Sequence, residues 1–533
     1  MHESDEPVTG PDPSTPPTSP TPSADSAADS EPPATAGSGR RAAVRPAKAS
    51  GFSGVAAGVL SAIRKHPKTW MAAAAAVVFL LLGTGSVALG ATIGSPAAAA
   101  GRTSTATPTP TRTSTPTPTP TVDPERPVPA NQAAATRIRT CSVAGLAGDR
   151  RLGNLEAQVV NAKTGQALFD RNGTKAGPTA SVLKTLTSAA ALATLGPDYR
   201  VSTTVVAGST PGQVVIVGGG DVTLSRLPDG QASFYTGAPK IQDLANQVKQ
   251  AMGGQQITSI VVDASLFGAP FWQPSWDERE ERVVEGSTPY MTALMVDGDR
   301  DDPTAVESPR STDPVGRAVQ YFQQYLGTNV GVSQGVATAG ARQLGVVQSQ
   351  PVTTLIDQAM RVSDNTIMEE LARLVAIKNG AGNTFDALNA GVLAGLKGYG
   401  IDTAGIHIAD GSGLSGDNAV PPSYLTQLFI KVLNRQNGLG VVYDSLPVAG
   451  KSGTLGPGYN RFTGANSAAR GAVLAKTGWI DNGYTLSGII NAADGTPLTF
   501  AVFALGPVSD NAKQAIDTLV TGFYKCGDNL SNG

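Results

Sequence analysis

The chain has 533 residues, of which 15% are charged and 5% aromatic, and its formal net charge is −2. This length predicts more than one structural part, and the near-neutral charge gives no field that would hold nucleic acid, so we expect no nucleic-acid partner. The three histidines, His2, His66 and His407, cannot complete a Cys/His zinc cage, and we expect neither a metal nor a cofactor. A Ser-His-Asp triad could use only His407 in the folded part, and its apolar neighbours indicate a strand or core residue instead.

The first 68 residues are predicted to form a disordered cytoplasmic segment, because residues 1–50 are rich in Pro, Ser, Thr, Ala and Asp. Residues 69–95 are predicted to form a single transmembrane anchor, since no charged residue occurs from position 70 to position 101. Three basic residues directly precede this stretch, and the positive-inside bias therefore places the N-terminus in the cytoplasm and the rest outside the cell membrane. The alternative is a cleaved signal peptide, with small residues for cleavage at positions 97–100, which would give a secreted protein.

Residues 96–135 are predicted to be an extended stalk, because positions 103–122 form a Thr/Pro repeat that favours polyproline-like conformations. The only two cysteines, Cys141 and Cys526, bracket everything that follows the stalk. In an oxidising exterior such a pair predicts a disulfide, which would make the N- and C-terminal elements neighbours. Two buried free thiols are the alternative.

Three short motifs follow one another in the order used by serine enzymes that a lysine activates. They are Ser181-Val-Leu-Lys184, Ser363-Asp-Asn365 and Lys476-Thr-Gly478. The second motif has a copy at residues 509–511, and Lys451-Ser-Gly453 could pass for the third. Each motif is weak alone, so the predicted elements around the copies must choose between them.

Ser181 opens a helical pattern over residues 181–195, so Ser181 and Lys184 share one helix face at i, i+3 spacing. Ser363-Asp-Asn365 is predicted to cap a helix over residues 366–376, and the copy at 509–511 is assigned to capping alone because it follows the third motif. Lys476-Thr-Gly478 ends an apolar strand that is followed by two more strands and a final helix, at residues 484–490, 497–505 and 512–524. Lys451 is predicted to lie in a loop instead.

These residue types indicate acyl transfer. The Ser181 hydroxyl would be the nucleophile, and Lys184 would accept its proton if burial and neighbouring charges favour the neutral amine. Lys476 and Ser363 would help to keep Lys184 neutral and relay the proton to the leaving amine, and Asn365 would offer its amide to the substrate or to Lys184. The N–H groups of Ser181 and Trp479 are the expected oxyanion donors.

The motifs and their surroundings resemble the D-alanyl-D-alanine carboxypeptidase/endopeptidase family, the class C low-molecular-mass penicillin-binding proteins of the penicilloyl-serine transferase group. The similarity spans roughly residues 140–525. It includes these flanking segments: Gly218-Gly-Gly-Asp-Val-Thr-Leu224, Val262-Asp-Ala-Ser-Leu-Phe267, Trp276, Thr288-Pro-Tyr290, Asp410-Gly-Ser-Gly-Leu-Ser415 and Leu446-Pro-Val-Ala-Gly450. In such proteins the last segment lies in the loop before the Lys-Thr-Gly strand. This is independent evidence that Lys451, which follows Gly450, does not belong to the third motif.

The resemblance implies an α+β fold: a β-lactamase/transpeptidase-like domain, with an antiparallel sheet flanked by helices, at residues 136–198 and 350–533. The family usually inserts two extra domains between its first and second motifs. Only 182 positions separate Ser181 from Ser363, so we expect one smaller inserted domain at residues 199–349.

The function implied is a serine D-Ala-D-Ala carboxypeptidase or endopeptidase that acts on peptidoglycan stem peptides or cross-links, with β-lactam antibiotics as covalent inhibitors. In this resemblance Thr477, Gly478 and Trp479 belong to the substrate-binding strand. Relatives commonly carry a hydroxyl residue at the position of Trp479, able to bind a terminal carboxylate. The alternatives are a serine β-lactamase and a non-catalytic envelope-binding or scaffolding protein.

Overall fold

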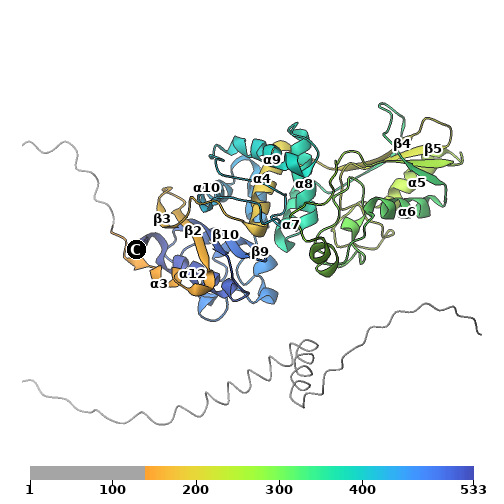
Figure 1. Ribbon diagram of the computed structural model, residues 1–533. Helices are drawn as coiled ribbons and strands as arrows, with labels where there is room; N and C mark the ends of the chain where they lie inside the picture. Colours follow the sequence, from red (N-terminus) through yellow and green to blue (C-terminus); the bar gives the residue numbers. More distant parts are fainter. Residues whose placement is uncertain (1–137, 533) are drawn as a thin grey trace, which may run out of the picture. The chain divides into compact units, whose positions relative to one another are not determined.

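The computed structural model describes residues 138–532 (Figure 1). The predicted cytoplasmic segment, membrane anchor and stalk lie outside these residues. From residue 138 to residue 532, no helix is long and apolar enough to cross a membrane.

A five-stranded antiparallel sheet is built from both ends of the described chain, in the order β3-β2-β11-β10-β9. The first hairpin pairs with the last strand through β2 and β11, where Val159 lies opposite Phe500. The predicted strands at 484–490 and 497–505 fall within β10 and β11. The bounds are β2 (Asn154–Asn161), β3 (Ala167–Arg171), β9 (Val473–Ile480), β10 (Gly483–Asn491) and β11 (Pro497–Leu505).

Both faces of this sheet are covered, as Figure 1 shows. Along β11 the side chains of Phe500 and Val502 pack with helix α12 (Ala512–Cys526), near the short helix α3 (Ala144–Ala147). The alternate residues Ala501 and Phe503 join the apolar cluster of the opposite face, which includes helix α10 (Pro422–Leu433). Strand side chains alternate between faces, so a strand with apolar residues at every position is stable only between two layers of helices.

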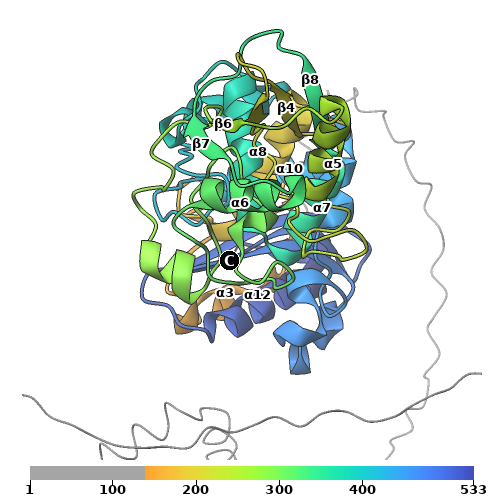
Figure 2. The same cartoon turned by 90° about the vertical axis from the view of Figure 1, so that its right-hand side faces the viewer.

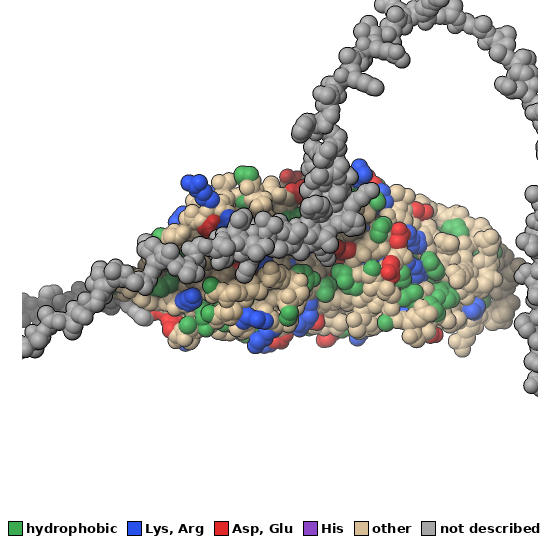
Figure 3. Space-filling view, turned by 90° about the horizontal axis from the view of Figure 1, so that it is seen from below, with side chains coloured by type: hydrophobic (Ala, Val, Ile, Leu, Met, Phe, Trp, Pro, Cys, Tyr) green, Lys and Arg blue, Asp and Glu red, His purple; other side chains and the backbone are tan. Residues whose placement is uncertain are grey.

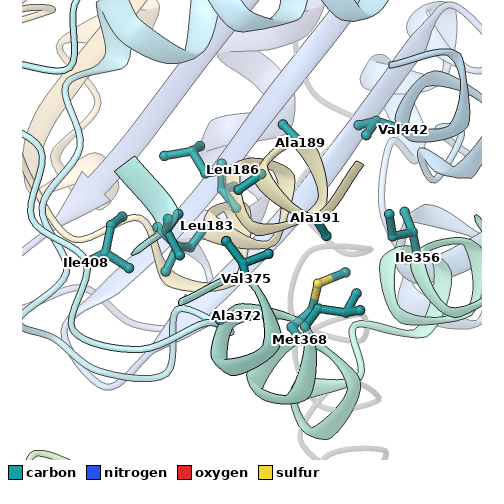
Figure 4. Close-up of a cluster of buried hydrophobic side chains, with 14 of the residues drawn as sticks. Leu183, Leu186, Ala189, Ala191, Ile356, Met368, Ala372, Val375, Ile408 and Val442 are labelled. Carbon is teal, nitrogen blue, oxygen red and sulfur yellow. The ribbon is translucent and has the colours of Figure 1, made fainter. Parts of the chain in front are cut away.

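The first motif ends at Lys184, the first residue of helix α4 (Lys184–Thr194), and its residues Val182 and Leu183 belong to the larger apolar cluster. Figure 4 shows Leu183 and Leu186 beside Met368 and Val375 of α8 (Asn365–Lys378), with Ile356 of α7 (Val352–Val362) nearby. Residues 184–192 of α4 are all buried, so the helix is enclosed on every side rather than amphipathic. Other helices around it are α7 (Val352–Val362), α9 (Leu388–Leu396) and α11 (Gly440–Ser445).

A second five-stranded sheet lies within residues 202–348, in the order β7-β6-β5-β4-β8 (Figure 2). It is mixed, because β5 pairs with β6 and β6 with β7 in parallel, whereas β4 pairs antiparallel with β5 and β8. Helices α5 (Ile241–Met252) and α6 (Pro314–Leu326) share an apolar cluster with it. The strands are β4 (Ser202–Ala207), β5 (Gln213–Val217), β6 (Ser259–Asp263), β7 (Gly331–Gln334) and β8 (Gln343–Gln348).

The predicted disulfide between Cys141 and Cys526 is confirmed, with 5.5 Å between the two Cα atoms. Cys141 begins β1 (Cys141–Ser142), which pairs in parallel with β12 (Leu530–Ser531) beyond the end of α12. The two ends of the described chain are therefore tied both covalently and by backbone pairing.

Acidic and basic side chains are interspersed on the face drawn in Figure 3 wherever grey atoms do not cover it. This mixture agrees with the formal net charge of −2. Such a face offers no single-sign field to a polyanion.

Candidate active site

Ser181 lies in a 3-10 turn (Ala180–Leu183) that leads directly into α4. The sequence predicted one α-helix from residue 181, but the first turn is a 3-10 turn, which is wound more tightly. Ala180, the residue before Ser181, has a left-handed φ of 46°. The turn is pressed against β9: a Cβ added to Gly478 would lie 2.9 Å from the Ser181 nitrogen. A side chain at position 478 would therefore force the strand away from the serine.

Lys184 is completely buried and donates three hydrogen bonds. Its Nζ atom lies 2.8 Å from Ser181 Oγ, 2.7 Å from Asn365 Oδ1 and 2.8 Å from the carbonyl oxygen of Ser412. An ammonium group has three protons to donate, so these three acceptors fix its position completely.

The second motif forms the tight connection between α7 and α8. Ser363 ends α7 in the left-handed conformation, with φ 64°, and Asn365 begins α8. Asp364 caps α8, as predicted, by accepting a hydrogen bond from the Ile367 N–H at 2.8 Å. Its other oxygen accepts from Arg300, a buried residue of the segment between the first and second motifs, at 2.9 Å.

Lys476 is also completely buried and points from β9 toward the second motif. Its Nζ donates to Ser363 Oγ at 2.8 Å and to the Thr477 carbonyl at 2.9 Å. The four side chains thus form two lysine–serine pairs, Lys184 with Ser181 and Lys476 with Ser363.

Burial changes the protonation of both lysines. It lowers the pKa of Lys184 to about 8, although the carboxylates of Asp410 and Glu369 act in the opposite direction. Burial, followed by the charge of Lys184, lowers the pKa of Lys476 well below its ordinary value. Two positive charges repel each other in a site without water, so one of the two lysine amines can be neutral near physiological pH.

The outer edge of β9 is available beside Ser181. The segment at 447–449 pairs with the start of the strand, where the Ala475 N–H donates to the Pro447 carbonyl at 2.9 Å. Because backbone groups alternate in direction along a strand, the N–H groups of Thr477 and Trp479 point to the same outer side as that of Ala475. The Trp479 N–H can therefore join the Ser181 N–H as an oxyanion donor.

An open cavity of about 1020 Å³ exposes this arrangement, lined by Ser181, Ser363, Asn365, Thr477, Gly478 and Trp479 among others. The Trp479 side chain is 48% exposed and lies opposite Tyr484 on β10. Carboxylates line another part of the wall, and burial with the neighbouring Glu285 and Asp481 raises the pKa of Glu281 to about 7.

The alternative copies lie elsewhere. Lys451 is exposed in a turn and does not line the cavity. Residues 509–511 precede α12, but the capping prediction was wrong in detail: Asn511 at the cap makes no side-chain capping bond, because Ser509 bonds to Asn511 instead.

His407 was expected in a strand or core, yet it sits exposed on an isolated β-bridge with Ala419, between two buried isoleucines.

Sequence reasoning missed two contributors. Thr454 follows the rejected Lys451-Ser-Gly copy, yet its hydroxyl lies 2.7 Å from that of Thr477, inside the cavity. Ser412 supplies a backbone carbonyl to Lys184, which no side-chain pattern announces. For Ser412 the sequence did offer a signal, because this residue lies in Asp410-Gly-Ser-Gly-Leu-Ser415, one of the segments that resemble the family.

Metal chemistry has no visible ligand set here. Between residues 138 and 532, no group of three or more His, Cys, Asp or Glu side chains is arranged to hold a metal ion.

Comparisons with known proteins agree with this geometry. The model of the D-Ala-D-Ala carboxypeptidase 3 (S13) family matches residues 140–309 and 295–524. Carboxypeptidase Rv3627c of Mycobacterium tuberculosis is 38% identical over 75% of this chain and 87% of its own length. Carboxypeptidase DacB of Mycolicibacterium smegmatis is 36% identical over 76% of this chain and 87% of its own length.

The fold is also that of a solved relative. Penicillin-binding protein 4 from Haemophilus influenzae matches with a TM-score of 0.61 and 20% identity, covering 72% of this chain and 99% of that protein. The resemblance inferred from the three motifs is thus confirmed at the level of sequence and of fold, and the chain belongs to the D-Ala-D-Ala carboxypeptidase 3 (S13) family.

Proposed function

We propose that the protein is a serine D-Ala-D-Ala carboxypeptidase/endopeptidase that hydrolyses D-alanyl bonds of peptidoglycan stem peptides or cross-links. The observation that carries the proposal is the pair of buried lysines, each bonded to a serine, at the edge of an open cavity. The names of the relatives, which are carboxypeptidases, support the same reaction.

Acylation begins when neutral Lys184 accepts the proton of Ser181 while Oγ attacks the carbonyl carbon of the scissile D-alanyl bond. The carbonyl oxygen becomes an oxyanion and accepts hydrogen bonds from the N–H groups of Ser181 and Trp479. As the tetrahedral intermediate collapses, the C–N bond breaks and the proton that Lys184 took from Ser181 passes through Ser363, whose hydroxyl is bonded to Lys476, to the leaving amine, so that Lys184 is neutral again. The product is acyl-Ser181.

Deacylation reverses these roles with water as the nucleophile. Lys184 removes a proton from water, the hydroxide attacks the acyl carbon, and Ser181 leaves with the proton returned to its oxygen. A β-lactam would acylate Ser181 in the same way, because its amide carbonyl would meet the same donors. Slow deacylation makes such a compound an inhibitor, whereas fast deacylation would make the protein a β-lactamase.

The division of the chain and its location belong to this proposal as well. We place the catalytic domain at 136–198 and 350–533 and the inserted domain at 199–349, which holds the second sheet. The uncharged stretch after position 69 supports a single-pass membrane anchor with an extracytoplasmic catalytic domain.

Labelling with a fluorescent penicillin tests the proposal. We expect one covalent adduct, mapped by peptide sequencing to Ser181, and no adduct in the Ser181→Ala variant. Labelling that persists in Ser181→Ala would overturn the assignment of the nucleophile. An unlabelled parent protein would favour a non-catalytic envelope-binding role, and an adduct lost within seconds would favour a β-lactamase.

A further inference from the structure

Lys184 depends on a backbone carbonyl for one of its three hydrogen bonds, and that carbonyl belongs to a buried loop. We infer that Glu369 is the positioning residue for this contact: its carboxylate holds the Gly411 and Ser412 peptide units so that the Ser412 carbonyl faces Lys184. The inference rests on the proposed function, in which Lys184 is the general base.

The backbone of this loop donates three hydrogen bonds to Glu369. One carboxylate oxygen accepts from the N–H groups of Gly411, at 3.0 Å, and Ser412, at 2.7 Å, and the other accepts from Gly411 at 2.9 Å. Glu369 and Ser412 are both fully buried. A carboxylate taken out of water is stable only with such donors, so the loop and the glutamate hold each other in place.

Helix α8 therefore positions Lys184 in two ways, directly through Asn365 and indirectly through the loop that Glu369 holds. Asn365 and Glu369 are one turn apart on the same helix face, at i, i+4 spacing. Asn365 accepts from Lys184 directly, and Glu369 acts through Ser412. A displacement of the Ser412 carbonyl would leave one lysine proton without an acceptor and allow Nζ to move away from Ser181.

The rest of the loop is equally constrained. Asp410 accepts from the N–H groups of Gly413, at 2.7 Å, and Ser415, at 2.6 Å. Gly413 has a φ of 87° and packs so closely that an added Cβ would lie 1.9 Å from the Ala180 carbonyl oxygen. Ala180 precedes Ser181, so the loop supports the nucleophile and its base together.

Charge gives Glu369 a second, measurable effect on the lysine. Burial, followed by Asp410, raises the pKa of Glu369, while the Ser412 hydroxyl and the loop N–H groups act in the opposite direction. Both oxygens of Glu369 accept hydrogen bonds from N–H groups, which favours the charged carboxylate. The carboxylates that raise the pKa of Lys184 are those of Asp410, Glu369 and Asp364. The neighbouring cations are Lys476 on β9, which is sensitive to the charge of Lys184, and Arg373 on α8, which is sensitive to that of Glu369.

Glu370 provides a matched control because it is the next residue of the same helix and is also fully buried. It faces Asp221 and Val222 rather than the 410–413 loop. It is also absent from the carboxylates that act on Lys184. A variant of Glu370 therefore changes an equally buried carboxyl that neither bonds to the 410–413 loop nor acts directly on Lys184.

The test compares Glu369→Gln, Glu369→Ala and Glu370→Gln in the full-length protein. The second-order rate constant for acylation by penicillin is measured as a function of pH, together with thermal unfolding of each variant. Glutamine keeps an oxygen for the Gly411 and Ser412 N–H groups but carries no charge, whereas alanine removes both.

We expect Glu369→Ala to acylate more slowly on the order of 100-fold, because the lysine is displaced. Glu369→Gln should acylate nearly as fast as the parent at alkaline pH, with the acid limb of its profile moved to lower pH by about one unit, because the charge that raises the pKa of Lys184 is gone. Glu370→Gln should leave the acid limb in place.

The inference fails if Glu369→Ala acylates as fast as the parent, or if Glu370→Gln moves the acid limb as far as Glu369→Gln does. If Glu369→Ala does not fold, the acid limb of Glu369→Gln decides alone, and an unmoved limb overturns the inference. A parent protein that penicillin does not label would instead refute the proposed function, so the two failures are distinct.

Discussion

At the scale of single residues, burial distinguishes the repeated copies of the third motif. Lys476 and Lys451 have the same chemistry and nearly the same following residues, but Lys476 is fully buried against Ser363 whereas Lys451 is exposed. Only a buried amine has its charge opposed strongly enough to take part in proton relay.

The first prediction compares these two lysines. Lys476→Ala should lower the rate of penicillin acylation by about 100-fold or more, because it removes the amine bonded to Ser363 and with it the proton relay next to the reacting atoms. Lys451→Ala, the matched surface variant, should change it little. Stopped-flow acylation kinetics measure both, and equal losses would mean that the wrong strand has been assigned.

The second prediction concerns Trp479, whose indole stands where the family resemblance leads us to expect a hydroxyl residue. Burial and Asp510 raise the pKa of Tyr484, and a hydrogen bond from Trp479 opposes them, so the indole is already engaged with Tyr484. Trp479→Thr should favour a substrate with a free terminal carboxylate over a cross-linked one, by on the order of 1–2 kcal/mol if one charge-assisted bond is restored.

Cleavage of a stem pentapeptide and of a cross-linked dimer by both proteins gives the ratio that matters. The Thr454 and Thr477 hydroxyls remain in the cavity in either protein, so both substrates should still be cleaved. An unchanged ratio would show that residue 479 does not set substrate preference.

Secondary-structure elements hold the site through their edges and ends. The 3-10 turn at Ser181, the junction of α7 and α8 and the free edge of β9 all meet at the cavity. These are the places where backbone N–H and carbonyl groups are not consumed by the helices and strands themselves. Away from the cavity, β1 pairs with β12 and joins the two ends of the described chain.

The third prediction addresses this closure. Replacing Cys141 and Cys526 by serine should lower the free energy of unfolding by roughly 2–5 kcal/mol, because the bridge closes a very long loop in the unfolded chain. Neither cysteine lines the cavity, so penicillin acylation of the folded variant should be retained. Urea unfolding of both proteins measures the effect, and identical midpoints would contradict it.

At the scale of the whole molecule, several carboxyl groups are buried, among them those of Asp221 and Glu370. Burial raises the pKa of Asp221 to about 6, and burial together with Asp221 raises the pKa of Glu370 well above its ordinary value. The folded state therefore binds protons that the unfolded state has released. Their contribution to stability is complete below the unfolded pKa near 4 and is lost as pH rises through the folded values.

The fourth prediction is that Glu370→Gln stabilises the protein at pH 8 by about 1–3 kcal/mol and has a smaller effect near pH 5, because the amide needs no proton to be buried. Its nitrogen can also donate to the unpaired Asp221 Oδ2. Urea unfolding at both pH values tests this, with the exposed Glu307→Gln as control. A stabilisation independent of pH would exclude titration as its cause.

The sequence by itself determined the family, the order of the three motifs, the terminal strands and the pairing of Cys141 with Cys526. These depend on local periodicity, on residue types at fixed spacing and on there being only two cysteines. The motif choice also followed, because a strand before Lys476 and turn residues around Lys451 are local features.

The tertiary structure alone decided the contacts that complete the site. Lys184 meets Ser412 across 228 positions, Thr454 meets Thr477 from a segment set aside as a loop, and His407 is exposed although its neighbours are apolar. Backbone carbonyls have no residue type, and hydrogen bonds between distant segments depend on how helices and sheets pack rather than on any pattern along the chain. For that reason the pairing of Ser181 with Lys184 could be predicted from the sequence, whereas the contact between Lys184 and the loop at Ser412 could not.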